Sequence, residues 1–592
     1  MGTCPPAVND LIAKFHEQAD QYRSPDYNET LVRIDFINPL FKALGWDMDN
    51  IAGYAEGYRD VVHEDAIRIE GNAKAPDYAF RVGGVRKFFV EAKKPFVKLR
   101  DDPAPAYQLR RYAWTAKLPL SVLTDFEEFV VYDTRVKPAW GDKASVARVN
   151  YLKCDEFPAR WEEVESLFSK ESILKGNFDR YAEGKKKRGT ADFDDAFLEE
   201  IETWRQELAQ NVALRNESLS EHDVNFTVQR IIDRIIFLRT CEARGIETFG
   251  QLQALLSGDQ VYPRLNVVFR AADAKYNSGL FHFAREPDRA ETPDEFTPGL
   301  MIDDRVLRGI LKRLYYPESP YAFSAMAPEI LGQVYEQFLG KVITLTAAHR
   351  AKVEEKPEVR KAGGVYYTPS YIVDYIVKHT VGDLLTPSPR TRGEGRGEGS
   401  ELTPKEAAKL KVLDPACGSG SFLLGAYQYL LDWHRNWYAT HDPEKCATGK
   451  SPRIRRVIAL RAAEAHATPA PADAWALTIA ERKRILLDNI FGVDIDYQAV
   501  EVTKLSLLLK VLEGENAETI GAQAKLFHDR ALPDLGRNIQ CGNSLIGTDI
   551  IATDAWRKMS EDERRRINPF DFERAFPNIM QTGGGRRVAL MR

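Results

Sequence analysis

The spacing of hydrophobic residues divides the 592-residue chain into three stretches with different predicted structures. In the first, residues 1–155, the run APDYAFRVGGVRKFFVEAKKP (75–95) places two β-rich segments on either side of Gly83-Gly84, which predicts a hairpin. A further strand is expected at FEEFVVYD (126–133). Helical segments alternate with these runs, so we expect a mixed α/β domain.

The second stretch, residues 156–350, is predicted to be mostly helical after a polar linker, YAEGKKKRG (181–189). In VQRIIDRIIFLRTCEARG (228–245), apolar residues recur at helical spacing and the pattern ends near Gly245. The run EILGQVYEQFLGK (329–341) repeats the pattern. Packing into a core explains both stripes, and neither predicts any chemistry.

The third stretch, residues 351–592, returns to an α/β pattern. A buried strand is predicted to end at Leu413, and a second at NIFGVD (489–494). Between 386 and 401 the sequence TPSPRTRGEGRGEGSE has no apolar residue, so it cannot bury surface. We expect a disordered insertion at about 386–403. The chain as a whole is predicted to be an α/β multidomain protein with a helical middle domain.

Composition narrows the class of protein. The net charge is −5, with 29 % charged and 44 % hydrophobic residues, so a surface that binds nucleic acid has to be a local basic patch. No apolar run has the length of a membrane span, and the N-terminus does not resemble a signal peptide. The six cysteines are scattered without a CxxC spacing. This argues against zinc sites and disulfides, and favours a reducing cytoplasm.

Three polar residues of the predicted hairpin could form a metal-dependent hydrolytic site. Glu91 and Lys93 are two residues apart and therefore share a strand face. Asp77 faces Glu91 only if the register pairs 77 with 91, which we expect to need an odd-length, bulged connection such as 83–85. Asp77 and Glu91 would then hold Mg²⁺, which lowers the pKa of a bound water beside Lys93.

The surrounding sequence strengthens this interpretation. A carboxylate at Glu91 inside FFVEA is costly to bury unless it is paired or used. Gln108 and Tyr112 lie four residues apart, on one helix face. The combination resembles the PD-(D/E)xK nuclease domain of type I and type IIG restriction enzymes, with its Gln-x-x-x-Tyr element. The resemblance implies an acidic helical residue at Glu29. The alternative is a degenerate nuclease fold that is retained for structure.

The sequence KVLDPACGSGSFLLGAYQYLL (411–431) carries the strongest motif. Asp414 follows a buried strand, and Gly418 and Gly420 form a tight turn before an apolar helix, where backbone amides can approach a ligand. The motif resembles motif I of the adenine-specific DNA methyltransferases that use S-adenosylmethionine (SAM). The resemblance implies cofactor-binding positions at Asp414, Ala416, Gly418 and Gly420, with Asp414 holding the SAM amino group.

Three further segments fit the same family. Asp494 ends the second strand, where an acid accepts ribose hydroxyls, and Asp496 is the better helix cap. The 80 residues between Asp414 and Asp494 require an inserted segment at about 433–485. The resemblance also implies motif X and motif III in the cofactor pocket. The additional positions that it assigns to the cofactor are Tyr367, Thr368, Pro369, Ile495 and Asn543.

The sequence INPFDFERAFPNIMQTGGGRRVALMR (567–592) raises the question of the catalytic motif, Asn-Pro-Pro-aromatic. The segment before Asn568 has seven charges in ten residues, so it cannot be a buried strand. We therefore expect Asn568 to lie in a turn or at a helix start. After Gly583–Gly585 we expect no further strand, and hence a methyltransferase domain that ends before its fourth strand and its target-recognition region.

The leading interpretation is a type IIG restriction–modification enzyme of the gamma class that acts on double-stranded DNA. Its expected parts are a nuclease-like domain (1–155), a helical connector (156–350) and an incomplete Rossmann-like methyltransferase domain (351–592). A second interpretation is a Mg²⁺-dependent endonuclease whose SAM region senses the cofactor without methylating. A third is a non-catalytic binding protein that is completed by a separate C-terminal chain. The preference for adenine N6 over cytosine N4 rests on the resemblance alone.

Overall fold

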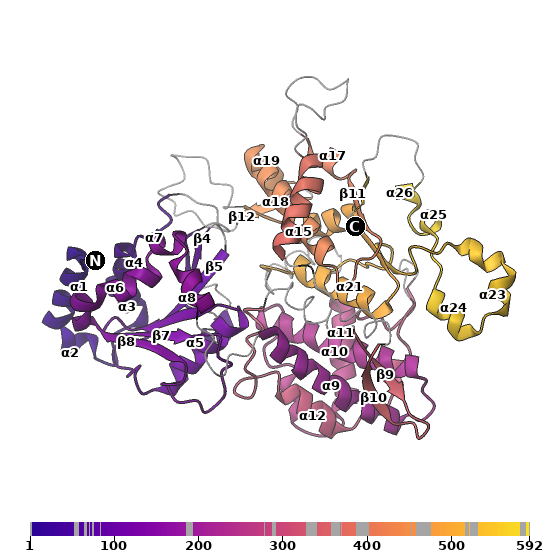
Figure 1. The fold of residues 1–592 in the computed structure, drawn as a ribbon, viewed down its shortest axis with the longest axis horizontal. Helices are drawn as coiled ribbons and strands as arrows, with labels where there is room; N and C mark the ends of the chain where they lie inside the picture. The colour runs from indigo at the N-terminus through magenta and orange to yellow at the C-terminus, as the bar shows by residue number, and fades with distance from the viewer. Residues whose placement is uncertain are drawn as a thin grey trace.

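A computed structural model of the chain shows three bodies (Figure 1). The N-terminal α/β body lies on the left, the helical middle body at the lower right, and the C-terminal α/β body above it. The residues that the structure describes are 3–52, 59–63, 68–69, 72–73, 76–82, 85–184, 193–276, 279–286, 292–326, 340–356, 368, 370–385, 402–449, 451–456, 475–515, 520, 531–580 and 588–590. The linker at 185–189, most of 329–341, the insertion at 386–401, and Tyr367 and Pro369 lie outside these residues.

The N-terminal body is built on one six-stranded sheet, with strand order β1-β4-β5-β6-β7-β8. Its strands are β1 (Val61–His63), β4 (Tyr78–Val82), β5 (Val85–Ala92), β6 (Leu120–Thr124), β7 (Glu128–Asp133) and β8 (Arg148–Lys153). Only β5 and β6 pair in parallel, and the other neighbours are antiparallel. A separate two-stranded ribbon joins β2 (Arg68–Ile69) and β3 (Asn72–Ala73).

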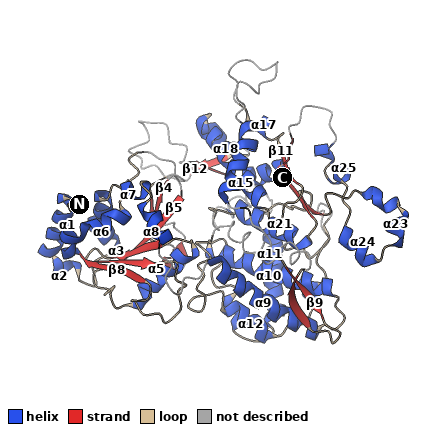
Figure 2. Cartoon of the chain, viewed as in Figure 1, coloured by secondary structure: helices blue, strands red, loops and turns tan. Residues whose placement is uncertain are grey.

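Helices cover both faces of this sheet (Figure 2). One face packs against α1 (Pro6–Glu17), α2 (Ala19–Tyr22), α3 (Glu29–Val32), η1 (Arg33–Ile37), α4 (Asn38–Ala43), α6 (Phe157–Phe168), α7 (Lys170–Leu174) and α8 (Asn177–Gly184). The other packs against α5 (Pro103–Thr115). Because Phe157, Trp161, Phe168 and Phe178 are buried in the N-terminal core, this body extends past the predicted boundary at 155 to the end of α8.

The hairpin register agrees with the sequence prediction. Tyr78 pairs with Val90, and continuing this register by one residue sets Asp77 opposite Glu91. Val82 pairs with Val85, so the connection is two residues rather than the odd number we expected. A β-bulge between Phe80 and Arg81 supplies the one-residue shift, because an extra residue on one strand offsets the pairing beyond it.

In its described residues, the middle body is helical, as predicted, apart from one antiparallel β-hairpin. Its elements are α9 (Phe193–Arg215), α10 (Glu221–Ala243), η4 (Gln253–Leu256), α11 (Val261–Lys275), η5 (Thr297–Gly299), α12 (Asp304–Lys312), β9 (Lys341–Leu345) and β10 (Ala351–Glu355). The predicted stripe at 228–245 lies in α10, where Ile231, Ile235 and Leu238 are buried. The hairpin β9–β10 packs on α9 and α10, and no alternation in the sequence had predicted it.

The C-terminal body has a parallel sheet with strand order β15-β14-β11-β16. The strands are β11 (Lys411–Asp414), β14 (Ile490–Asp494), β15 (Ile539–Cys541) and β16 (Val588–Leu590). The expectation that no strand follows Gly585 is therefore wrong. Val588, Ala589 and Leu590 pair with β11, so they occupy the fourth strand position; three residues in register suffice beside a strand that is already formed.

Helices α18, α20 and α21 cover one face of this sheet, and a small hydrophobic cluster from the segment 570–580 covers the other. The elements of this body are α15 (Ser370–Val377), η6 (Lys378–Gly382), α16 (Asp383–Leu385), α17 (Pro404–Ala407), α18 (Ser421–Thr440), α19 (Pro443–Ala447), β12 (Ile454–Arg456), β13 (Trp475–Leu477), α20 (Ile479–Asn489) and α21 (Tyr497–Val511). The predicted insertion at 433–485 contains the end of α18, α19, the β12–β13 pair and the start of α20. On the opposite face, Leu413 and Val493 meet Phe570, Phe576 and Ile579.

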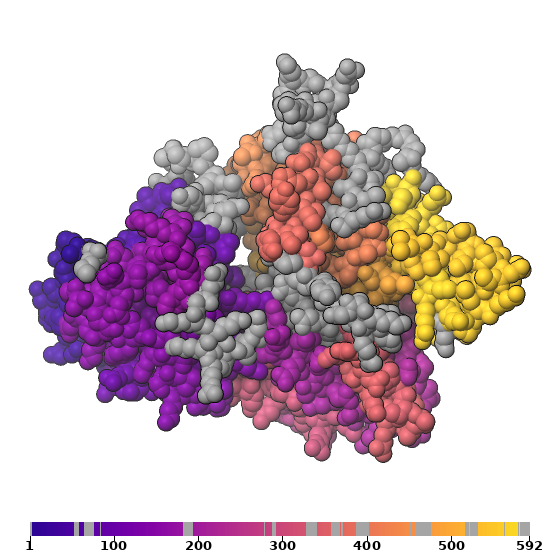
Figure 3. Space-filling model, in the orientation of Figure 1, coloured from indigo at the N-terminus to yellow at the C-terminus, as the bar shows by residue number. Residues whose placement is uncertain are grey.

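The last described helices extend from the edge of the molecule (Figure 3). They are η8 (Thr548–Ala552), α23 (Asp554–Lys558), α24 (Glu561–Ile567), α25 (Phe572–Ala575) and α26 (Pro577–Met580). Among all the helices of the described ranges, none combines the length and the apolar character that crossing a membrane requires.

Candidate active sites

Five side chains of the N-terminal body form the carboxylate–lysine cluster: Glu29, Asp77, Glu91, Lys93 and Gln108. Glu91 lies near the end of β5, and Lys93 follows it on the same strand face. The Lys93 Nζ donates to Glu91 Oε1 at 2.7 Å, and the Gln108 Nε2 of α5 donates to the same oxygen at 2.8 Å. Glu29 Oε2 lies 4.0 Å from Lys93 Nζ. The structure thus brings together all five residues that the sequence assigned to this site.

Glu91 has the most perturbed environment of the cluster. It is 2 % exposed, and burial raises its pKa from 4.5 to about 8, against the opposing effect of Lys93 and with a further increase from Asp77. Its Oε2 atom is buried and has no hydrogen-bond partner. A buried carboxylate oxygen without a partner is costly, so this position is suited to an additional cation.

The pKa values of Glu29 and Lys93 are shifted by burial and by the charges of their neighbours. Burial raises the pKa of Glu29, and the neighbouring Lys93 opposes this effect. Burial alone would lower the pKa of Lys93, but Glu91 and Glu29 together hold it above its usual value. Lys93 therefore remains a charged donor between two carboxyl groups.

Asp77 is fixed from two sides. Its Oδ2 accepts from the backbone N–H of Ala92 at 2.7 Å, and its Oδ1 lies 3.5 Å from the Arg33 guanidinium. Arg33 also donates to the Tyr78 hydroxyl at 3.2 Å and lies over the Tyr78 ring. The sequence analysis missed Arg33, although its position four residues after Glu29 places the two on one helical face and could have indicated it.

The donor set fits a hard divalent cation. Asp77 and Glu91 offer carboxylate oxygens, which Mg²⁺ prefers, and Glu91 Oε2 is the buried oxygen that lacks a partner. Gln108 and Tyr112 are on one face of α5, as predicted, and Glu91 contributes to the raised pKa of the buried Tyr112. Helix α5, which carries both residues, begins at Pro103 because the Asp102 side chain accepts from the Ala104 N–H and caps the helix.

The second site lies at the carboxyl ends of β11 and β14. Asp414 is 5 % exposed, and its Oδ1 accepts from the Ala416 N–H at 3.1 Å. Asp494 accepts from the Gly418 N–H at 2.9 Å and from the Asp496 N–H at 2.8 Å. Burial, with a contribution from Asp494, raises the pKa of Asp414 to about 6. Two carboxyl groups thus lie close together at the ends of neighbouring parallel strands.

The turn after β11 depends on close approach of the backbone. Gly418 and Gly420 both have positive φ, at 53° and 86°. A Cβ on Gly420 would lie 2.8 Å from Thr503 Cγ2, and the Thr503 hydroxyl donates to the Gly418 carbonyl at 2.8 Å. Thr503 of α21 thus holds the turn, a role that the sequence analysis did not assign.

The chain matches two families of DNA methyltransferase. The family model described as "MmeI, DNA-methyltransferase domain" matches residues 400–563, and that described as "N-6 DNA Methylase" matches residues 326–445. The chain is 34 % identical over 564 residues to the type II restriction enzyme and methyltransferase RM.Eco57I of Escherichia coli, an alignment that covers 95 % of this chain and 51 % of that protein. The chain is a homologue of type II restriction–modification enzymes.

Other similarities are more distant. An adenine-specific methyltransferase, BrxX of Escherichia coli O9:H4 (strain HS), is 26 % identical over 312 residues, covering 49 % of this chain and 21 % of that protein. A solved structure, the cryoEM structure of a DrdV–DNA complex, is 13 % identical with a TM-score of 0.31, covering 94 % of this chain and 42 % of that chain. The chain spans about half the length, or less, of the curated relatives it matches.

Three further positions that the sequence assigned to the cofactor lie among the described residues: Ile495, Thr368 and Asn543. Ile495 follows Asp494 and is half exposed. Thr368 precedes α15, which packs so closely on α18 that a Cβ at Gly425 would lie 2.6 Å from Val373 Cγ1. Asn543 follows β15, and its N–H donates to the Asn568 carbonyl at 2.7 Å. Asp496 caps α21, as predicted.

Asn568 lies in a turn, one of the two positions predicted for it. It ends α24 with a left-handed φ of 42° and does not start a helix. Its Nδ2 lies 3.4 Å from the Cys541 Sγ of β15, and Pro569 forms a parallel β-bridge with Asn543. Asn568 is thus about three strand spacings, ~14 Å, from β16.

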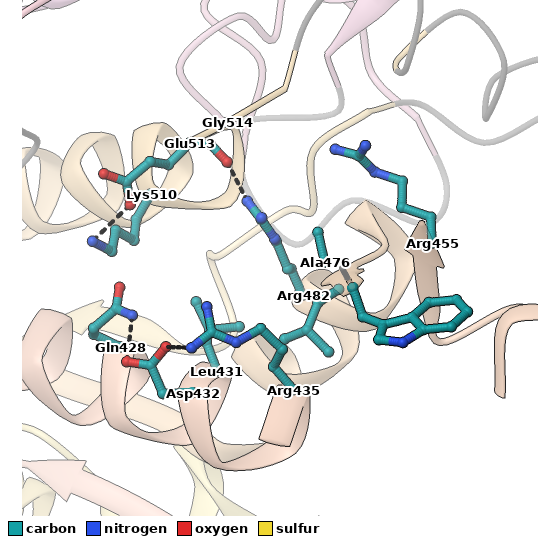
Figure 4. A pocket seen from close by; sticks show the side chains of 12 residues that line it. Gln428, Leu431, Asp432, Arg435, Arg455, Ala476, Arg482, Lys510, Glu513 and Gly514 are labelled. Atoms are coloured by element: carbon teal, nitrogen blue, oxygen red, sulfur yellow. Dashed lines mark hydrogen bonds and ion pairs between the residues drawn. The ribbon is translucent and has the colours of Figure 1, made fainter. Parts of the chain in front are cut away.

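A separate polar pocket of about 320 Å³ lies between α18, β12, β13, α20 and the end of α21 (Figure 4). Four cationic side chains line it, and each has an internal partner. Arg435 pairs with Asp432, Arg455 with Glu515 and Lys510 with Glu513, and Arg482 donates to the Val511 carbonyl at the end of α21. The four cations of the pocket are therefore satisfied by partners within the protein, and neither Asp414 nor Asp494 lines the pocket.

Proposed function

We propose that this chain acts in a type IIG restriction–modification system, in which a Mg²⁺-dependent DNA endonuclease precedes a SAM-dependent, adenine-N6-specific DNA methyltransferase. The nuclease proposal rests on Glu91, whose buried Oε2 lacks a partner within the carboxylate–lysine cluster. The methyltransferase proposal rests on Asp414 and Asp494, which lie together at the ends of adjacent parallel strands. Double-stranded DNA is the proposed substrate of both sites.

In the C-terminal site, the chain's own groups would bind and orient the cofactor. SAM supplies the methyl group. Asp494 already accepts two backbone N–H groups, but a carboxylate has about four acceptor positions, which leaves room for ribose hydroxyls. Asp414 uses one oxygen for the Ala416 N–H, and the other would accept from the SAM amino group. Ile495 would pack against the adenine ring.

In the N-terminal site, Asp77 and Glu91 would hold Mg²⁺, which lowers the pKa of a bound water. Arg33 and the Ala92 N–H fix the Asp77 carboxylate, and Gln108 fixes Glu91 Oε1. Lys93, held charged by Glu91 and Glu29, would orient the water and face the phosphate.

Cleavage of supercoiled plasmid DNA tests the nuclease. We expect Mg²⁺-dependent cutting that is lost on addition of a chelator and reduced at least 100-fold by Glu91→Gln. Glu162→Gln, at an exposed glutamate of α6 in the same body, is the matched control and should cut normally. Equal cutting by the Glu91→Gln and Glu162→Gln proteins would contradict the nuclease assignment.

Equilibrium dialysis with labelled SAM tests the cofactor site. Asp494→Ala should weaken SAM binding at least tenfold, whereas Asp554→Ala, at an exposed aspartate of α23, should leave it unchanged. Transfer of labelled methyl groups to DNA, followed by identification of N6-methyladenine, tests the reaction itself. If the wild-type protein binds no SAM, the methyltransferase proposal for the C-terminal body is wrong.

The second candidate function is a Mg²⁺-dependent endonuclease with a C-terminal region that senses SAM without transferring its methyl group. The observation that favours it is the position of Asn568, the asparagine of the Asn-Pro-Phe sequence, beside β15 and away from β16. SAM binding with no methyl transfer to DNA would select this candidate. Methyl transfer by this chain that Asn568→Ala abolishes would exclude it.

A further inference from the structure

A second group of metal-ligating side chains lies in the N-terminal body, outside the carboxylate–lysine cluster. His16 is on the last turn of α1, and Cys154 and Asp155 begin η3 (Cys154–Glu156), directly after β8. The three candidate ligand atoms all lie within 4.8 Å of one another, although His16 and Asp155 are 139 residues apart in sequence. We call these three residues the His–Cys–Asp cluster.

The burial of the cluster is graded from the core to the surface. Cys154 is 1 % exposed, whereas the side chains of His16 and Asp155 are 47 % and 61 % exposed. The thiol is therefore fixed in the protein, and the other two ligands face solvent, from which an ion can enter. The imidazole and carboxylate can also move: His16 Nε2 and Asp155 Oδ1 are 2.5 Å apart and must separate to about 3.3 Å to bind one tetrahedral ion.

The charges around the cluster match a divalent cation. A thiolate and a carboxylate, with a neutral imidazole, carry two negative charges and balance a 2+ ion. Arg23, a cation whose charge acts on Cys154, is already paired with Glu127 through two hydrogen bonds of 3.0 and 2.7 Å. A metal therefore does not have to compete with Arg23 for the cluster.

We propose that His16, Cys154 and Asp155 form a binding site for Zn²⁺, with water as the fourth ligand. Nitrogen and thiolate ligands select zinc over Mg²⁺ and Ca²⁺, which prefer oxygen. Binding replaces the proton of the Cys154 thiol by the metal and releases that proton to solvent. The ion ties α1 to the end of β8, so the site serves the stability of the N-terminal body and is independent of the proposed nuclease chemistry.

Cobalt substitution of the full-length protein tests the proposal. Titration with Co²⁺ should produce a thiolate-to-cobalt charge-transfer band in the near ultraviolet with a stoichiometry near one, and Zn²⁺ should abolish the band. Cys154→Ser should eliminate the band, and His16→Ala and Asp155→Ala should each weaken Co²⁺ binding at least tenfold. Cys446→Ser, at a half-buried cysteine of α19, is the control and should leave the band unchanged.

Three outcomes would overturn the site: no charge-transfer band in wild-type protein, a band that survives in Cys154→Ser, or binding unaffected by His16→Ala. The carboxylate–lysine cluster contains no thiol, so Co²⁺ bound there gives no such band and the two sites are distinguished. His16 is exposed, so its replacement tests the site even if Cys154→Ser fails to fold.

Discussion

At the residue scale, Glu91 connects stability to metal binding. Its pKa is raised from 4.5 to about 8, so folding favours the neutral acid. In metal-free protein this stabilising contribution is complete below pH 4.5 and is lost as the pH rises through 8. A bound cation requires the opposite form, the carboxylate. Stability and metal binding should therefore have opposite pH dependences at this one side chain.

We predict that the apparent Mg²⁺ affinity rises with pH by up to about tenfold per unit between pH 6 and 8, because Glu91 must lose its proton. Calorimetric titration in buffers with different ionisation enthalpies should count about one proton released per ion. Glu91→Gln should remove both the affinity and the proton release, and Glu162→Gln should retain them. A flat pH dependence in wild-type protein would contradict the assignment of the metal to Glu91.

Arg33 is predicted to act as a positioning residue for Asp77. Arg33→Ala should raise the Mg²⁺ concentration needed for half-maximal cleavage and lower the rate about 10- to 100-fold, because Asp77 loses the cation that holds Oδ1. Arg33→Lys should recover part of the loss, since it keeps the charge. The control, Lys98→Ala, removes an exposed cation of the same body. Unchanged Mg²⁺ dependence in Arg33→Ala would show that Arg33 has no such role.

At the element scale, the turn between β11 and α18 links β11 to its neighbours. Gly418 donates to Asp494 at the end of β14, and Gly420 lies against Thr503 of α21, so the turn sets the spacing between β11, β14 and α21. A side chain at 420 meets two separate penalties: the left-handed backbone and the contact with Thr503. Gly449 of the same body allows the two penalties to be measured separately, because it has a positive φ but no close neighbour.

Gly420→Ala is predicted to cost more stability than Gly449→Ala. Each should lose about 1–3 kcal/mol from positive φ, but a Cβ at Gly449 meets nothing within 4 Å, whereas one at Gly420 lies 2.8 Å from Thr503. Adding Thr503→Ser to Gly420→Ala should restore part of the difference, because it removes the methyl group and keeps the hydroxyl. Urea unfolding and SAM binding measure both effects. Equal losses in the two alanine variants would contradict the close contact.

At the scale of the whole molecule, buried polar contacts connect the three bodies. Arg111 of α5 donates to the Tyr321 carbonyl of the middle body at 2.6 Å. Arg230 of α10 pairs with Glu501 of α21 at 2.5 Å, and these side chains are 8 % and 4 % exposed. Because α21 begins at Tyr497, three residues after Asp494 ends β14, the Arg230–Glu501 pair reaches the helix that directly follows Asp494.

Breaking this pair should destabilise the junction of the middle and C-terminal bodies. Arg230→Met is predicted to cost about 3–5 kcal/mol, because the buried Glu501 loses its 2.5 Å ion pair and keeps only the weaker contacts with Lys504, at 3.3 Å, and Tyr497. Arg230→Met combined with Glu501→Leu should recover most of the loss, since the buried carboxylate is removed with its partner. Denaturant unfolding of the wild-type, single-mutant and double-mutant proteins gives the coupling energy. A double mutant less stable than Arg230→Met would refute this account.

The sequence predicted the local parts of the fold well. The hairpin at 78–92, the helix at 228–243 and the strand ends at Asp414 and Asp494 follow from short-range periodicity and turn chemistry. It failed where long-range pairing decides the structure. Val588–Leu590 is too short to be recognised as a strand until β11 is beside it, and Phe157–Phe178 joins the N-terminal core only because that sheet offers an apolar face.

The sequence by itself determined where the carboxylates at strand ends and the glycines of the tight turn lie, because both are constrained by their immediate neighbours. Only the tertiary structure decided which distant residues meet. Scattered cysteines gave no reason to expect a zinc site, yet His16 lies beside Cys154 and Asp155 once α1 packs at the end of β8. Arg33 reaches Asp77 in the same way. Such meetings depend on the sum of many packing contacts, which no local pattern contains.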